Sequence, residues 1–344
     1  MVVLQHLGGV SAMGVYAVFG FYTLSGYLMT LILHSGYDYS RSGIRRYALN
    51  RFLRIYPIYW VACAVSIALI VWLGNQFTTD LNQNLFLPDS ISSFFQNFLI
   101  LFGRYSTPRL LSPTWALSVE LLFYVLIGLG VSRSKKVTCC WFGISVVYAV
   151  AVNLLPMGFM DRYNLMYAFF PAASLPFSTG AMIYYFREGI VKRLAFLRNA
   201  YMPAILFMLV ILNYMACRKL DVLLSAGFYL NFGLNALLLV SLIDRKELPL
   251  VSRKLDKKCG DFSYPIYLIH FQAALFIMGI SPAFRKESLS LVAASLPVIL
   301  VLAWLLTVIV ERPIEKIRQK VKGDQPAELI VRNPAPSLNQ QEVS

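Results

Sequence analysis

Residues 289–310 read LSLVAASLPVILVLAWLLTVIV, a run of 22 residues without a charged side chain. A helix needs about 20 mostly apolar residues to cross the hydrocarbon core of a bilayer, so this run predicts a transmembrane helix. Apolar stretches of similar length recur along the chain, near residues 13–34, 56–74, 114–131, 137–155, 165–186, 199–216, 222–243 and 262–281. The sequence therefore predicts an all-α fold, a polytopic transmembrane bundle with nine full spans.

The composition of the whole chain supports a membrane protein. Of its 344 residues, 58% are apolar and 14% are charged, whereas soluble domains have about 45–50% apolar and about 25% charged residues. So much apolar surface needs lipid around it, which excludes a soluble globular enzyme and a disordered chain. The three histidines and five cysteines show no metal-ligand spacing, so we expect no metal site.

Three stretches need a different interpretation. Residues 2–10 (VVLQHLGGV) are apolar but too short to cross a bilayer, so we interpret them as the end of a further span that begins before Met1. The apolar piece from Phe94 to Phe102 is also short and predicts a re-entrant or interfacial segment. Residues 323–344 are polar and contain three prolines, which predicts a disordered cytoplasmic tail after a membrane domain formed by residues 1–322.

The basic residues predict the orientation of the bundle. When both termini are placed in the cytoplasm, the cytoplasmic segments contain 24 of the 31 lysines and arginines, and the outer segments contain seven. Cytoplasmic loops of membrane proteins are enriched in these residues, so we expect this topology. Because it also accounts for most of the net charge of +14, we expect membrane lipids and no nucleic acid as partners.

Ionisable side chains inside membrane spans are costly and are therefore candidates for function. Glu120 lies well inside a predicted span, in the stretch TWALSVELLFY. It is either a structural carboxyl that hydrogen-bonds between helices or a group of an active site. His270 lies midway along the span 262–281, and His6 lies in the short N-terminal stretch. Each is either an interhelical hydrogen-bond partner or a catalytic histidine, since a neutral imidazole can act as a general base.

The stretch RRYALNRFLRIYPIYW, residues 45–60, combines arginines with interfacial aromatic residues. Arg51 and Arg54 are three residues apart and share one face of a helix. One interpretation is an anchor for anionic lipids with an aromatic belt. The other is a cytoplasmic clamp for phosphate groups, because the guanidinium fork matches phosphate oxygens.

Five short motifs follow one another along the chain. They are FGFYTLSGYLM at residues 19–29, RRYALNRFLRIYPIYW at 45–60, TWALSVELLFY at 114–124, SYPIYLIH at 263–270 and VERP at 310–313. Together they resemble the acyltransferase-3 family of integral-membrane acyltransferases. Beyond the residues already discussed, the positions that match the family motifs are Ser25, Gly26, Tyr56, Pro57, Trp115, Ser118, Tyr264, Tyr267, Glu311 and Arg312.

The resemblance implies an enzyme that transfers an acyl group, with acetyl expected, from cytoplasmic acyl-CoA to a hydroxyl of a cell-surface polysaccharide or a lipid-linked sugar. It implies a bacterial inner or plasma membrane, acyl-CoA as co-substrate and no bound cofactor. His6 matches the family's histidine and would be a general base or form an acyl-histidine, with Glu120 orienting it, stabilising its charge or contacting the sugar. The residues expected to bind the donor are Arg45, Arg46, Arg51 and Arg54.

The sequence departs from the family pattern in two places. The family has an arginine eleven residues before the histidine, a position that would fall before Met1, and Ala116 stands where it has a serine. Either the start is placed too late, the protein is a truncated relative, or the arginine is dispensable here. We expect a start placed too late, because half a span has no stable way to sit in a bilayer. Two alternatives to an active acyltransferase remain. One is a transporter or flippase for a lipid-linked sugar, which would also use buried ionisable residues. The other is an inactive, truncated relative.

Overall fold

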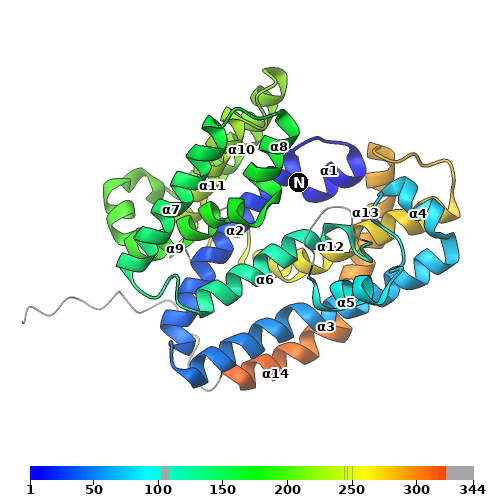
Figure 1. The fold of residues 1–344 in the computed structure, drawn as a ribbon, viewed down its shortest axis with the longest axis horizontal. Helices are drawn as coiled ribbons and strands as arrows, with labels where there is room; N and C mark the ends of the chain where they lie inside the picture. Colours follow the sequence, from blue (N-terminus) through cyan, green and yellow to red (C-terminus); the bar gives the residue numbers. More distant parts are fainter. Residues whose placement is uncertain (102–107, 244, 246, 250, 323–344) are drawn as a thin grey trace, which may run out of the picture.

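The computed structural model describes residues 1–101, 108–243, 245, 247–249 and 251–322 (Figure 1). The predicted tail, the Phe102 end of the predicted interfacial segment, and Arg104, Lys246 and Arg332 of the charge count lie outside these residues. Within them the structure is helical and has no strand beyond one isolated bridge between Leu248 and Val251. The prediction of an all-α fold is confirmed.

Fourteen α-helices form the described part of the chain. They are α1 (Val2–Gly8), α2 (Met13–Ile32), α3 (Arg41–Leu73), α4 (Asn75–Leu81), α5 (Ile91–Leu99), α6 (Trp115–Gly128), α7 (Lys135–Leu154), α8 (Phe159–Tyr163), α9 (Ser174–Arg193), α10 (Met202–Lys219), α11 (Ala226–Leu242), α12 (Arg253–Ile280), α13 (Leu289–Leu306) and α14 (Arg312–Lys322).

Six helical stretches of the described chain are long and apolar enough to cross a membrane. They are Met13–Tyr37, Arg41–Leu73, Lys135–Leu154, Met202–Lys219, Arg253–Ile280 and Leu289–Lys322. Two shorter apolar helices, Ser112–Gly128 and Ala226–Leu242, coincide with two more of the predicted spans. The apolar runs thus do form helices, while the total of nine full spans stays a prediction.

The span predicted over 165–186 is interrupted. A π-helical turn covers Asn164–Ala168, a 3-10 turn covers Phe170–Ala173, and α9 begins only after them. Pro171 explains the break, because proline has no N–H to donate and its ring clashes with the preceding turn. Pro176 is tolerated because it lies in the first turn of α9, where backbone N–H groups have no intrahelical acceptor.

Helices α2 and α9 pack with their backbones in close contact. A Cβ atom at Gly26 of α2 would run into the carbonyl oxygen of Phe177 in α9, and one at Gly180 would run into the carbonyl oxygen of Thr23. Small residues permit such contacts between helices in membranes. The short α1 packs against α2, α12 and α13, and α14 packs along α3 (Figure 1).

Candidate active site

Two adjoining cavities lie between these helices. The first, here called the histidine cavity, has a volume of about 190 Å³ and is lined by His6, Asn84, Trp115 and other largely polar or aromatic residues. The second, the arginine cavity, has a volume of about 340 Å³ and extends from Arg51 and Arg54 past mainly apolar side chains. Both cavities share four lining residues, which are Val2, Val18, Ala116 and Tyr267. We call this shared boundary the junction.

His6 and His270 form a pair at the histidine cavity. Nδ1 of His6, on α1, lies 2.9 Å from Nε2 of His270, on α12. The two rings are stacked, with centroids 5.2 Å apart, and Phe271 stacks on His6 at 5.0 Å. His270 is fully buried. The position of α1 is fixed from the other side by Gln5, whose Oε1 accepts a 2.6 Å hydrogen bond from the N–H of Gly14 in the first turn of α2.

The hydrogen bonds of the pair assign its protons. Nδ1 of His270 lies 2.9 Å from the carbonyl oxygen of Tyr267 and 3.3 Å from that of Ile266. A carbonyl oxygen can only accept, so Nδ1 of His270 carries the proton and, in the neutral ring, Nε2 is an acceptor. Nδ1 of His6 must then be the donor across the pair. This leaves Nε2 of a neutral His6 with a lone pair, which is the form that a general base needs.

Glu120 lies in the wall of the arginine cavity. Its side chain is 3% exposed, and Oε1 accepts hydrogen bonds from the hydroxyl of Tyr124, one helical turn along α6, and from Oγ of Ser25 at 3.2 Å. The structure thus brings Glu120 to Ser25 and Tyr124, whereas the hydrogen-bond partner of His6 is His270. Glu120 thus joins α6 to α2 and also lines the arginine cavity.

Arg51 and Arg54 line the arginine cavity, and Arg318 lies beside them without lining it. Arg54 forms a salt bridge with Glu311, the glutamate of the VERP motif. Arg51 donates to Oδ1 of Asn50 at 2.8 Å, and Arg318 of α14 donates to the same oxygen at 3.3 Å. Arg318 also forms a salt bridge with Glu315. The three arginines and the two glutamates together keep one net positive charge, and such a cluster attracts an anion.

The other two expected donor residues lie outside this cavity. Arg45 is exposed and Arg46 is half-buried, and neither lines the arginine cavity. Both belong to the N-terminal part of α3, which begins at Arg41 with Ser40 as its N-cap and runs without a break through Pro57. Among the described residues, no group of three or more histidine, cysteine, aspartate or glutamate side chains could hold a metal ion.

A comparison with family models decides the classification. The model described as an acyltransferase domain, that of acyltransferase family 3, matches residues 1–308. The chain belongs to the acyltransferase-3 family. No curated protein and no solved structure matches the chain. The family and the apolar helices together indicate an integral-membrane acyltransferase.

Several residues of the acyltransferase-3 motifs connect helices of the site. The hydroxyl of Tyr264 donates to the carbonyl of Ile55 at 3.0 Å, and that of Tyr267 donates to the carbonyl of Pro113. Ser118 donates to the carbonyl of Ile100 at 2.8 Å. These motif residues therefore fix α12 on α3, α12 on the turn before α6, and α6 on the end of α5.

Aromatic residues of α3 donate hydrogen bonds to the C-terminal end of α5. Tyr56 donates to the carbonyl of Leu99 at 2.9 Å, and Trp60 donates to that of Phe98 at 3.0 Å. Between them, Tyr59 donates to the carbonyl of Asn97 at 2.6 Å. The last carbonyl groups of a helix have no intrahelical partner, so these three side chains satisfy the C-terminal end of α5. Arg312, by contrast, is exposed at the start of α14.

Sequence reasoning missed two arginines of this acyltransferase. Arg318 shares Oδ1 of Asn50 with Arg51, and it comes from the basic segment after the last predicted span, where its charge resembles that of any cytoplasmic flank. Arg109 lines the histidine cavity and is only 2% exposed, although its sequence context is that of an outer loop. No local sequence pattern marks either arginine as a site residue, because both reach the site only through tertiary contacts.

Proposed function

We propose that this protein is a membrane O-acyltransferase that transfers an acyl group, acetyl being the expected one, from cytoplasmic acyl-CoA to a hydroxyl of a cell-surface or lipid-linked carbohydrate. The observation that carries the proposal is the junction, where a cavity with an arginine cluster meets a cavity with a histidine pair. A donor and an acceptor can reach one another there from separate cavities.

The arginine cavity suits the donor. Arg51, Arg54 and Arg318 would bind the phosphate groups of acyl-CoA, since guanidinium groups form bidentate bonds with phosphate. The apolar walls beyond them, which include Phe21 and Leu24, would hold the arm that carries the thioester. The acyl carbonyl would then lie at the junction.

The histidine cavity suits the acceptor. A hydroxyl oxygen of the sugar attacks the carbonyl carbon of the thioester while Nε2 of His6 takes the hydroxyl proton. The carbon–sulfur bond breaks, and the proton passes from His6 to the departing thiolate of CoA. His270 contacts neither substrate in this scheme. It is a positioning residue, which holds His6 in the tautomer that can accept a proton.

Three further points belong to the proposal. An acyl-histidine on His6 is the competing route, in which the acyl group forms a covalent bond with Nε2 before it reaches the sugar. Glu120 is placed beside the donor arm, because it lines the arginine cavity. The protein would lie in a bacterial inner or plasma membrane with both termini in the cytoplasm, which puts the arginine cluster on the side where acyl-CoA is made.

Purified protein incubated with radiolabelled acetyl-CoA tests this function. We expect acetyl-CoA turnover that rises when a carbohydrate acceptor is added, and we expect His6→Ala to lower transfer by about 10²–10⁴-fold at unchanged membrane abundance. His34→Ala is the matched control, since His34 bonds to Ser132 and Tyr185 instead of lining the cavity. An acetylated peptide containing His6 would favour the covalent route.

Two results would contradict the proposal. Full activity of His6→Ala would remove His6 from the mechanism. Binding of a sugar by the wild-type protein without any consumption of acetyl-CoA would favour a transporter or an inactive relative.

A further inference from the structure

Arg109 brings a positive charge into the histidine cavity. Its side chain is 2% exposed and comes from the segment before α6. Among the described residues that line this cavity there is no aspartate or glutamate, so the formal charge that they contribute is positive. Because charges interact more strongly in a buried site than in water, this arginine dominates the electrostatic character of the cavity.

The backbone on both sides of Arg109 is held in place. Asn97, which is 2% exposed, donates from Nδ2 to the carbonyl of Pro108 at 2.8 Å and accepts at Oδ1 from the N–H of Leu110 at 2.9 Å. The N–H of Arg109 itself donates to the carbonyl of Asn84 at 2.7 Å. A site whose backbone is held in this way is partly organised before its ligand arrives, which reduces the entropy lost on binding.

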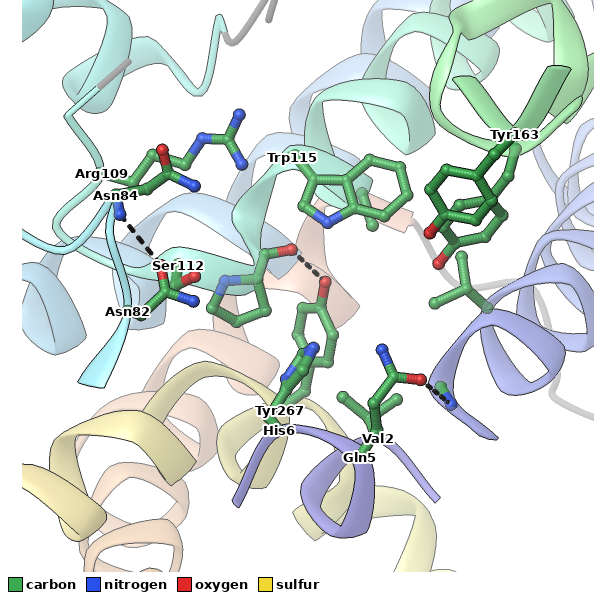
Figure 2. Close-up of a pocket in the computed structure, with 15 residues that line it drawn as sticks. Val2, Gln5, His6, Asn82, Asn84, Arg109, Ser112, Trp115, Tyr163 and Tyr267 are labelled. Carbon is green, nitrogen blue, oxygen red and sulfur yellow. Dashed lines mark hydrogen bonds between the residues drawn. The ribbon is translucent and has the colours of Figure 1, made fainter. Parts of the chain in front are cut away.

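The remaining walls carry groups that suit a sugar. Trp115 packs edge-on against Tyr167 with ring centroids 5.2 Å apart, and Tyr163 lies 5.5 Å from Tyr167. Figure 2 shows Arg109 and Asn84 on one side of Trp115 and Tyr163 on the other, and all four line the same cavity as His6. A ring with polar edges and one anionic group would match this arrangement.

We infer that the acceptor carries an anionic group, a carboxylate or a phosphate, which Arg109 binds in the same cavity as His6. This inference rests on the proposed function, which places the acceptor there. At about 190 Å³ the cavity is smaller than the range of about 300–1,000 Å³ usual for ligand pockets. One charged sugar unit therefore enters it.

A third cavity has room for the rest of the acceptor. An open cavity of about 300 Å³ shares Gln5, His6 and Asn82 with the histidine cavity. Glu287 on its rim follows Arg285 and Lys286 in one exposed loop, so the net charge of that loop does not oppose an acidic chain. An acidic oligosaccharide can extend through this opening while its terminal unit meets Arg109.

Three acceptors that differ in one group test the inference: a neutral hexose oligosaccharide, its counterpart with a terminal hexuronic acid, and its counterpart with a terminal sugar phosphate. With acetyl-CoA as donor, we expect kcat/KM at least about ten-fold higher for an anionic acceptor than for the neutral one. The better of the two anionic acceptors identifies the source of the charge. Arg109→Gln should remove this preference, and Arg109→Lys should retain part of it.

Matched measurements separate this inference from the proposed function. Arg218→Gln, at an exposed arginine in the last turn of α10, should keep the preference. Equal use of neutral and anionic acceptors, or an unchanged preference in Arg109→Gln at normal abundance, would overturn the inference. If acetyl-CoA is never consumed, the proposed function fails, while the Kd of the hexuronic acid oligosaccharide for the wild type and for Arg109→Gln still decides whether the anion site exists.

Discussion

His6 and His270 are 264 residues apart in the sequence, yet their ring nitrogens lie 2.9 Å from one another. The helix that carries His270 also supplies the carbonyl oxygens that fix the tautomer of the pair. The backbone of a helix from the other end of the chain therefore determines which nitrogen of His6 carries the proton.

Substitution of His270 should separate positioning from direct participation. We expect His270→Ala to lower kcat by about ten-fold or more, because a buried hydrogen bond is worth about 1 kcal/mol and its unsatisfied partner costs more. KM for acyl-CoA should stay near the wild-type value. His270→Gln should recover part of the activity, since its amide oxygen can accept from Nδ1 of His6. Equal losses in both variants would indicate that an imidazole is needed at this position.

Arg54→Lys distinguishes a phosphate clamp from a lipid anchor. The lysine keeps the charge and can still pair with Glu311, but it loses the planar fork that binds two phosphate oxygens. We expect KM for acyl-CoA to rise several-fold at constant protein level. Arg41→Lys, at an exposed arginine in the first turn of the same helix, is the control. Unchanged kinetics in Arg54→Lys would support the anchor.

The junction can be blocked at Ala116. A leucine there adds bulk where the two cavities share a wall, so transfer to sugar should fall by at least about ten-fold while acyl-CoA still binds. Overpacking costs about 1–3 kcal/mol, so abundance and thermal stability must be measured alongside. Ala151→Leu, at an exposed position of α7, makes the same change away from the cavities. Normal transfer by Ala116→Leu would show that the acyl group does not pass this point.

Packing of α2 on α9 should fail in Gly26→Ala. The added methyl group would clash with the carbonyl of Phe177, and backbone atoms cannot move aside as a flexible side chain can. We expect a marked loss of folded protein in membranes. Gly143→Ala makes the same change on α7, where no atom lies within 4 Å of the new carbon, and should be neutral or stabilising by up to about 1 kcal/mol. Equal abundance of the two variants would contradict this account of the helix contact.

Reporter fusions test the predicted membrane orientation of the chain. A reporter fused after Lys322 should be cytoplasmic, and one inserted at Gln83, an exposed residue between α4 and α5, should be on the outer side. The expectation follows from the distribution of lysine and arginine. A cytoplasmic signal from Gln83 would contradict the predicted orientation and the side from which the donor enters.

The fold was largely predictable because apolar runs such as 289–310 can only be buried in lipid or in other helices. The break before α9 was signalled by Pro171, although the length of the interruption was not. Within the site, Glu120 and Tyr124 are four residues apart on one helix, so their contact could have been predicted from spacing. The His6–His270 pair and the place of Arg109 could not, because distant segments create them and no local pattern records which helices meet.

The hydrogen bonds from Tyr56, Tyr59 and Trp60 of α3 to the last carbonyl groups of α5 have a consequence for the choice of donor. They bind the segment with Asn97 to the same rigid helix that carries Arg54. From Arg54 to Ser66, which contacts the carbonyl of Leu110, that helix rises by about 18 Å at 1.5 Å per residue. In the proposed function, helix α3 thus sets the distance between Arg54, which would bind the donor phosphates, and Arg109, which would bind the acceptor. Under the same proposal, an acyl carrier with a shorter arm would hold its thioester short of His6, so we expect transfer to depend on the length of the donor arm as well as on its charge.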